Sequence, residues 1–372
     1  MTVDTAEPAP VPYGPTGESP IVLVGTLIDG TGADPLPDAA LVIQGAHILA
    51  LGPRTEVTIP AHAQLFDAQG TTILPGFINT HVHNAYLNTN LKTWAQAGVT
   101  TVRDMGAPFG GYSFSTRDVL NANPEYAQII AAGPLVTVPD GYPIAGNNFS
   151  SLTVDSPEDA REKINQLVDE GADVIKITLT IGVFPTLSLE QATAIVETAH
   201  ARGIPVTVHA TTARDLERAL DAGVDDVAHI ATDHVSDELI QRMVQADVAW
   251  VPTLAILRGR GADNLRRFVN AGGRVALGND AGYLAGVLIG MPTNEIEQLH
   301  HAGLTPMQII VAATRNAAEV CRVDDTLGTL EVGKQADVLV VKGDPLKDIA
   351  ALQDVQLVIH NGTIIREWGI PH

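Results

Sequence analysis

Short runs of β-branched and apolar residues alternate with amphipathic helical segments through the middle of the chain. Eight runs have the length and composition of strands: residues 72–83, 99–105, 129–138, 173–179, 205–210, 225–230, 249–255 and 274–280. Strands that alternate with helices predict a parallel sheet, because a parallel neighbour requires a crossover connection. Eight βα units within residues 71–331 have the size of a (β/α)₈ barrel of the TIM type, so we expect this α/β fold.

The segments between the strands carry helix start and stop signals. Segments 156–171 and 188–203 begin with Ser and end with Gly, while 212–223 and 236–246 begin with Thr and Ser. A Ser or Thr side chain can accept a free N–H group of the first turn, and Gly readily ends a helix. These segments are therefore predicted to be helices that connect the strands.

Both ends of the chain differ from its middle. Residues 20–70 and 332–372 read as short strands separated by Gly and Pro, and Asn361-Gly362 is a strong hairpin signal. Neither end can build a large core alone, so we expect the two to form one small composite β-sandwich. Residues 1–19 are rich in proline and are expected to be a disordered leader. Strands are expected at 21–27, 40–44, 47–51, 336–341, 355–360 and 363–366.

The charge balance limits the classes of partner. The 372 residues have a formal net charge of −21 and no cluster of Lys or Arg, so a nucleic acid would be repelled. The N-terminus lacks the features of a signal peptide, and no apolar run reaches the length of a membrane span. We therefore expect a cytoplasmic protein that acts on a small molecule, without a nucleic acid or membrane partner. A homo-oligomer is compatible with the sequence.

Candidate ligand residues fall where predicted strands end. The first strand ends at His81-Val82-His83, and alternate residues of a strand point to the same side, so both imidazoles face the barrel axis. The fifth strand ends at His209, the sixth at His229, and the eighth at Asp280. Active sites of such barrels lie at these strand ends, and imidazole and carboxylate groups bind divalent metals. The alternatives are surface or core histidines and an N-cap role for Asp280.

Lys176 is an unusual residue for an apolar strand. It lies in the sequence Val174-Ile175-Lys176-Ile177-Thr178, where a buried ammonium group is unfavourable unless it is neutralised or paired. Addition of CO₂ would give a carbamate, whose two anionic oxygens can bridge two metals. An unmodified lysine that acts as a base, Schiff-base former or substrate anchor is the alternative.

The chain resembles the amidohydrolase superfamily of metal-dependent (β/α)₈ hydrolases, and within it the imidazolonepropionase-like and prolidase-like subgroup. The resemblance extends over nearly the whole chain after the leader. It is carried by the stretches 74–83, 97–104, 208–210, 228–229, 278–282, 313–318 and 328–337.

This resemblance implies a binuclear centre. His81, His83 and Asp280 would hold one divalent ion, His209 and His229 the second, and a carbamate on Lys176 would bridge them. Zn²⁺ is the expected metal, while Mn²⁺, Co²⁺ and Fe²⁺ are compatible with the same ligands.

The implied reaction is hydrolysis of an amide-type C–N bond, in a peptide-like or cyclic amide, or of an ester in a small, partly apolar substrate. A metal-bridging hydroxide would attack the carbonyl, and Asp280 would be the catalytic proton shuttle. The first alternative is a mononuclear deaminase of a heterocycle, with Lys176 uncarboxylated. The second is a barrel that binds metal without catalysis.

Several loop residues are candidates for substrate binding. Aromatic residues cluster in the predicted loops around the barrel mouth, and Arg103 could bind a substrate carboxylate, as could Arg258 or Arg260. The candidate tyrosines are Tyr86, Tyr112, Tyr142 and Tyr283. Alternatively, the aromatic rings seal the loops against the helices, and Arg103 forms a structural ion pair.

Overall fold

The computed structural model describes residues 19–106, 113–143, 151–182, 184–282 and 286–368. Residues 1–18 of the predicted leader, together with Tyr112 and Tyr283, lie outside the described residues. None of the helices in the described part is long and apolar enough to cross a membrane.

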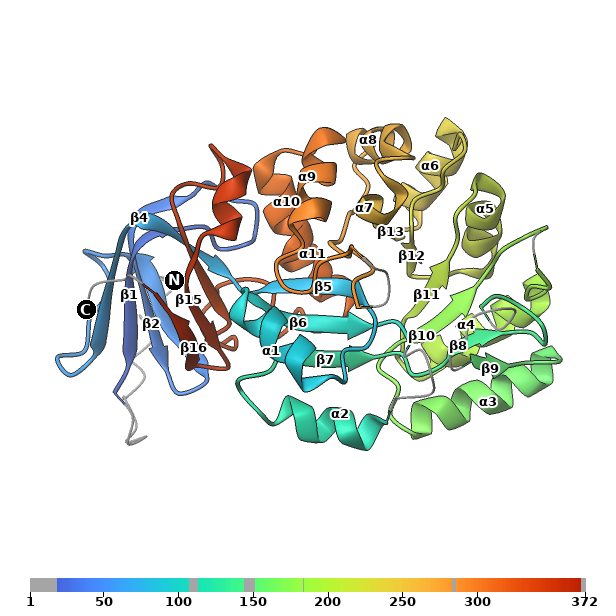
Figure 1. The fold of residues 1–372 in the computed structure, drawn as a ribbon, viewed down its shortest axis with the longest axis horizontal. Coiled ribbons are helices and arrows are strands. Elements are labelled where there is room, and N and C mark those ends of the chain that lie inside the picture. Colours follow the sequence, from blue (N-terminus) through green and yellow to red (C-terminus); the bar gives the residue numbers. More distant parts are fainter. Residues whose placement is uncertain (1–18, 107–112, 144–150, 183, 283–285, 369–372) are drawn as a thin grey trace, which may run out of the picture.

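Strands from both ends of the chain combine in one seven-stranded sheet, at one end of the molecule in Figure 1. Its order is β16-β15-β14-β4-β1-β2-β3, so β4 joins the N-terminal strands to the C-terminal ones. The predicted hairpin is confirmed, since Asn361 and Gly362 both have positive φ, 48° and 74°. The arrangement of this sheet as a two-layered sandwich stays a prediction. Its strands are β1 (Ile21–Leu27), β2 (Leu36–Gln44), β3 (His47–Pro53), β4 (Gln64–Pro75), β14 (Val338–Lys342), β15 (Val355–His360) and β16 (Thr363–Glu367).

The expected first strand, residues 72–83, is two strands that belong to different sheets. β4 ends at Pro75, and β5 (Phe77–Val82) begins after Gly76. Gly76 lies so close to Thr100 that a Cβ atom would come within 2.4 Å of its Oγ1. The apolar composition is continuous across this point, so sequence patterning could not detect the change of sheet.

All strand pairs of the other two sheets are parallel, as the alternation of strands and helices predicted. One sheet has the order β5-β6-β7, and the other has the order β13-β12-β11-β10-β8-β9. The expected third strand is divided between β7 and β8. The bounds are β6 (Val99–Asp104), β7 (Gln128–Ala131), β8 (Leu135–Thr137), β9 (Ser151–Thr153), β10 (Ile175–Thr178), β11 (Val206–His209), β12 (Asp226–Ala228) and β13 (Ala249–Val251).

The expected eighth strand, residues 274–280, forms only isolated bridges. Val275 bridges to Trp250 of β13, and Ala281 bridges to Val82 of β5, both in parallel orientation. The Thr80 N–H also donates to the Leu277 carbonyl at 2.8 Å. The segment therefore makes hydrogen bonds to both of the sheets in which every strand pair is parallel.

The four predicted helices begin where the sequence placed them. The side chains of Ser156, Ser188, Thr212 and Ser236 each accept a backbone N–H of the first turn. The helices are α1 (Asn88–Gln96), α2 (Phe114–Asn121), α3 (Pro157–Asp169), α4 (Leu189–Ala201), α5 (Ala213–Ala222), α6 (Asp237–Gln245), α7 (Leu254–Leu257), α8 (Ala262–Asn270), α9 (Thr293–His301), α10 (Pro306–Ala313), α11 (Arg315–Val320) and the 3₁₀ helix η1 (Ile349–Gln353).

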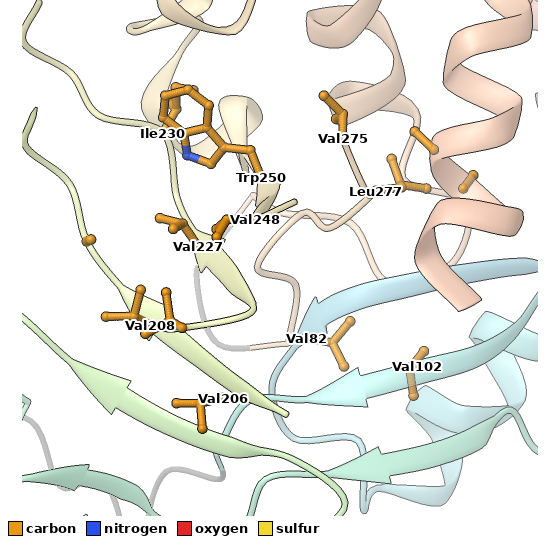
Figure 2. Close-up of a cluster of buried hydrophobic side chains, with 14 of the residues drawn as sticks. Val82, Val102, Val206, Val208, Val227, Ile230, Val248, Trp250, Val275 and Leu277 are labelled. Atoms are coloured by element: carbon orange, nitrogen blue, oxygen red, sulfur yellow. The ribbon is translucent and has the colours of Figure 1, made fainter. Parts of the chain in front are cut away.

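Alternate residues of the parallel strands form the main hydrophobic core. Val82, Val206, Val208 and Val227 are fully or almost fully buried in this cluster, which Figure 2 shows. Because neighbouring residues of a strand point to opposite sides, their neighbours face away from this core. The packing of these valines thereby positions the side chains between them, which include His81 and His209.

Candidate metal centre

All six predicted ligand residues line one cavity of about 210 Å³. His81 lies on β5, Lys176 on β10 and His209 at the end of β11. His83 and His229 come directly after their strands, and Asp280 lies in the segment that bridges to β5. Segments that are far apart in the sequence thus supply one set of converging donors.

His81, His83 and Asp280 form the tightest group of potential ligands. Their donor atoms all lie within 4.8 Å of one another, and all three residues are buried. Oδ1 of Asp280 is 3.0 Å from Nε2 of His83 and 3.4 Å from Nε2 of His81. A single cation could contact all three groups.

His209 and His229 form a second pair beside this group. Their ring centroids are 4.5 Å apart, and the His229 ring is 4.9 Å from the ring of His81. The four imidazoles therefore form a continuous cluster rather than two separate sites. One edge of it meets Tyr142, whose ring is 4.7 Å from that of His209.

Backbone and side-chain partners fix the orientation of two of the rings. Nδ1 of His83 lies 2.5 Å from the Gly106 carbonyl oxygen, so it must carry the proton of the neutral ring and donate it. In the neutral ring, that tautomer directs the Nε2 lone pair toward Asp280, where it could bind a metal ion; when Nε2 is protonated, it donates to Oδ1 of Asp280 at 3.0 Å. Nδ1 of His229 pairs with Oγ1 of Thr253 at 2.8 Å, which leaves its Nε2 available as well. Such partners are typical of metal-binding histidines.

Burial keeps most of these imidazoles neutral. It lowers the pKa of His209 to about 3 and the pKa values of His81 and His229 well below their usual range, and the charge of Lys176 acts in the same direction. Burial also lowers the pKa of His83, but the hydrogen bond and charge of Asp280 outweigh it and raise the net pKa. Neutral rings beside one carboxylate suit a divalent cation.

Lys176 is buried among these groups, and among the described residues its Nζ atom has no hydrogen-bond partner. Burial lowers its pKa to about 7, and the charge of Arg103 acts in the same direction. A substantial fraction of the amine is then neutral at neutral pH, and only the neutral amine can add CO₂. Nδ1 of His81 is also buried without a partner. The donor set therefore fits divalent metal ions.

Two glycines allow the Asp280 segment to approach the histidines. A Cβ atom at Gly282 would lie 1.8 Å from the carbonyl oxygen of His83, and φ there is +101°. A Cβ atom at Gly278 would lie 2.8 Å from Cβ of His81. The motif Gly278-Asn279-Asp280-Ala281-Gly282 thus has a steric explanation that the sequence did not reveal.

The carboxyl group of Glu295 holds the loop behind His229. Glu295 of α9 is fully buried, and its two oxygens accept the N–H groups of Leu254 and Ala255 at 2.8 and 2.7 Å. These residues begin α7 and directly follow Thr253, the partner of His229. The sequence alone identified neither Thr253 nor Glu295 as a candidate site residue. Thr253 lies near the end of the predicted strand 249–255 and could have been suspected, but Glu295 lies on a helix without any local signal.

The residues that were predicted to contact the substrate lie in different environments. Tyr142 lines the cavity, whereas Tyr86 packs against the hydrophobic core. Arg103 is fully buried and forms two hydrogen bonds with Asp226, both 2.8 Å long, and its Nε donates to the Thr80 carbonyl at 2.7 Å. This geometry favours the structural ion pair for Arg103 over a contact with substrate.

Comparison with known proteins agrees with this geometry. The model of the amidohydrolase family matches residues 72–365. The chain belongs to the amidohydrolase family. This confirms the resemblance that the motifs indicated, and the relatives below support the imidazolonepropionase-like and prolidase-like subgroup.

Three relatives of this amidohydrolase illustrate the subgroup. The imidazolonepropionase of Symbiobacterium thermophilum is 26% identical, over 82% of this chain and 84% of that protein. The ochratoxinase of Aspergillus niger is 25% identical, over 94% of this chain and 88% of its own length. A crystal structure of a Xaa-Pro dipeptidase with bound methionine superposes with a TM-score of 0.83 at 27% identity, covering 93% of this chain and 99% of that one.

The close approach at Gly282 generates a prediction. Gly282→Ala should displace the Asp280 segment from His83 and lower metal content at least tenfold, measured by elemental analysis of the purified protein. Gly272→Ala is the matched control, because φ there is also positive (+88°) but nothing lies within 4 Å of the added methyl group. Equal metal content in the two variants would contradict the steric explanation.

The buried carboxylate of Glu295 generates a second prediction. Glu295→Ala leaves two buried N–H groups unpaired, which should lower the free energy of unfolding by about 2–5 kcal/mol. Chemical denaturation measures this change. Glu297→Ala, on the exposed face of the same helix, should change it little.

Glu295 also gives stability a pH dependence. Burial raises its pKa from 4.5 to about 8, so between these values the folded protein binds more protons than the unfolded chain. This group therefore makes the free energy of unfolding fall as pH rises through that window. Glu295→Gln should flatten the fall, and an unchanged slope would show that the carboxyl group does not titrate there.

Proposed function

We propose that this amidohydrolase is a metal-dependent hydrolase that cleaves an amide-type C–N bond, or an ester bond, in a small substrate. The observation that carries the proposal is the convergence of four imidazoles, one carboxylate and a buried lysine on one cavity. The names of the relatives support action on C–N bonds. They point to different substrates, so they support the bond class rather than one compound.

The architecture behind this proposal is a (β/α)₈ barrel. The parallel pairings, and the bridges from residues 274–281 to both β13 and β5, support it. On the other side, the Asp173 N–H donates to the carbonyl of Ala131, which links β7 to the start of β10. We propose residues 71–331 as the barrel and residues 20–70 with 332–372 as the accessory β-sandwich.

We assign two metal positions to the cavity. His81, His83 and Asp280 would hold one ion, and His209 and His229 the other, with a carbamate on Lys176 between them. The buried Nζ atom without a partner supports the modified lysine, because a carbamate would have metal ions as its partners. Zn²⁺ is the first choice, and Mn²⁺, Co²⁺ or Fe²⁺ would suit the same donors.

Metal ions bound here would lower the pKa of a bound water and polarise a substrate carbonyl. Asp280 would accept the proton of that water and return it to the leaving nitrogen or oxygen. Its backbone N–H donates to the His81 carbonyl at 2.9 Å, which holds the carboxylate in place. Its φ of 59° is also rare outside glycine, and such strain is frequent at functional sites.

A mononuclear deaminase is the second candidate. The observation that favours it is the compactness of the His81, His83 and Asp280 group, which could hold a single ion alone. Lys176 would then keep its free amine and could contact the substrate.

The role of Asp280 can be tested by substitution. Asp280→Asn should lower kcat by about 10²–10⁴-fold, since the amide cannot accept the proton, while metal content falls much less. Steady-state kinetics and elemental analysis on the same preparation give both values. The exposed Asp34→Asn serves as a control, and kcat within tenfold of the wild type for Asp280→Asn would refute the proton-transfer role.

The state of Lys176 separates the two candidates. The hydrolase proposal expects about two metal ions per chain and one CO₂ on Lys176, visible as added mass under native conditions and as a carbamate signal with ¹³C-labelled bicarbonate. Lys176→Met should lose the signal and at least one ion, whereas the exposed Lys342→Met should lose neither. One ion and a free amine in the wild type would favour the deaminase.

A further inference from the structure

We propose that the group of the substrate that enters this cavity is apolar and uncharged, so that amides or esters with a neutral hydrocarbon substituent are accepted and their carboxylate-bearing counterparts are rejected. The inference rests on the proposed hydrolytic function and names the substrate class of the same site. It follows from the wall of the cavity and from the placement of the cations around it.

The wall beside the candidate metal centre is mostly hydrocarbon. Leu135 of β8, Ile256 and Leu257 of α7, and Tyr142 with Pro143 line the cavity together with the six candidate ligands and Thr211. The α7 part of this wall is fixed by the carboxylate of Glu295, which binds the first N–H groups of that helix. A substituent placed there meets side chains rather than ordered polar partners.

Among the described residues, the wall of the cavity offers a substrate carboxylate no free Lys or Arg side chain. Lys176 is the only Lys or Arg among its described lining residues, and it belongs to the candidate metal centre. Arg103 is bound on both sides of its guanidinium by Asp226. Arg258 and Arg260 follow the α7 wall in the sequence, but both are exposed and neither lines the cavity.

The remaining segments supply no Lys or Arg side chain either. Residues 1–18, 107–112, 144–150, 183, 283–285 and 369–372 lie outside the described residues, and their sequences contain no Lys or Arg. The formal net charge of −21 further disfavours the approach of an anion. A carboxylate placed against the apolar wall would lose its hydration without gaining an ion pair to a Lys or Arg side chain, whereas a hydrocarbon group gains from leaving water.

Two matched substrates test the inference. In 4-methylpentanoyl-4-nitroanilide and succinyl-4-nitroanilide, an isopropyl group and a carboxylate of similar shape end otherwise equal acyl chains, and the corresponding 4-nitrophenyl esters extend the pair. We expect kcat/KM to be at least about 100-fold higher for the neutral member of each pair, since an unpaired buried charge is strongly unfavourable. A ratio near one, or a preference for succinyl, would overturn the inference.

A measurement of binding distinguishes failure of this inference from failure of the proposed function. The same pair with the scissile carbonyl reduced to a methylene group cannot be hydrolysed, and calorimetry with the metal-loaded wild type measures its affinity directly. Preferred binding of the neutral compound without hydrolysis of any substrate would support the inference and refute the hydrolase. Hydrolysis with equal affinities for the two compounds, or no binding of either, would refute the inference.

A substitution can place a lysine side chain on the apolar wall of the cavity. Ile256→Lys should reduce the preference for the neutral compound at least tenfold, because an ammonium group on the wall can pair with the carboxylate. Val119→Lys adds the same charge at a residue that is 73% exposed on α2, and should leave the preference unchanged. If Ile256→Lys does not fold, as judged by circular dichroism, Leu257→Lys replaces it. Equal effects of the wall and surface variants would attribute the preference to net charge and overturn the assignment to the wall.

Discussion

The contact between residues 274–282 and β5 is the constraint on which the candidate site depends. The Thr80 hydroxyl donates to the carbonyl of Leu277, 197 positions away in the sequence, and the Asp280 N–H donates to the carbonyl of His81. Gly278 and Gly282 permit this approach, because side chains there would collide with His81 and His83. Without this contact, the Asp280 side chain would not lie close enough to the two histidines to bind the same metal ion.

Burial then determines the chemistry of the groups that the contact brings together. It lowers the pKa values of three imidazoles and of Lys176, which favours their neutral forms, whose lone pairs can bind a metal ion. The same low polarity requires charges below the site to be paired. Arg103 and Asp226 meet this requirement, and Thr207 adds a hydrogen bond to Asp226. This ion pair thus supports the proposed centre without facing the cavity.

The loop behind His229 connects the proposed metal ligands with the proposed substrate wall. Thr253 contacts the His229 ring, and the next residues form α7, which supplies Ile256 and Leu257 to the cavity. Glu295 holds this loop from α9 through two backbone hydrogen bonds. The orientation of the His229 ring and the shape of the cavity wall are therefore coupled through the short segment that contains Thr253 and α7.

Local patterns in the sequence predicted the parallel strands, the helix starts and six of the residues that line the cavity, the candidate metal ligands. These features depend on alternation along a strand and on capping by the nearest side chain, so neighbouring residues contain the needed information. The change of sheet at Gly76 and the bridging geometry of residues 274–281 depend on distant partners, and local patterning missed both.

By itself, the sequence determined the residue types of the candidate centre, their positions in or directly after predicted strands, and the family that the chain resembles. Only the tertiary structure decided that Arg103 is bound by Asp226, that Glu295 anchors α7, and that the described part of the cavity wall is mostly apolar, with Lys176 as its only Lys or Arg. These features depend on which side chains meet across the fold. Burial and pairing are set by contacts between distant segments, and a linear pattern does not encode those contacts locally.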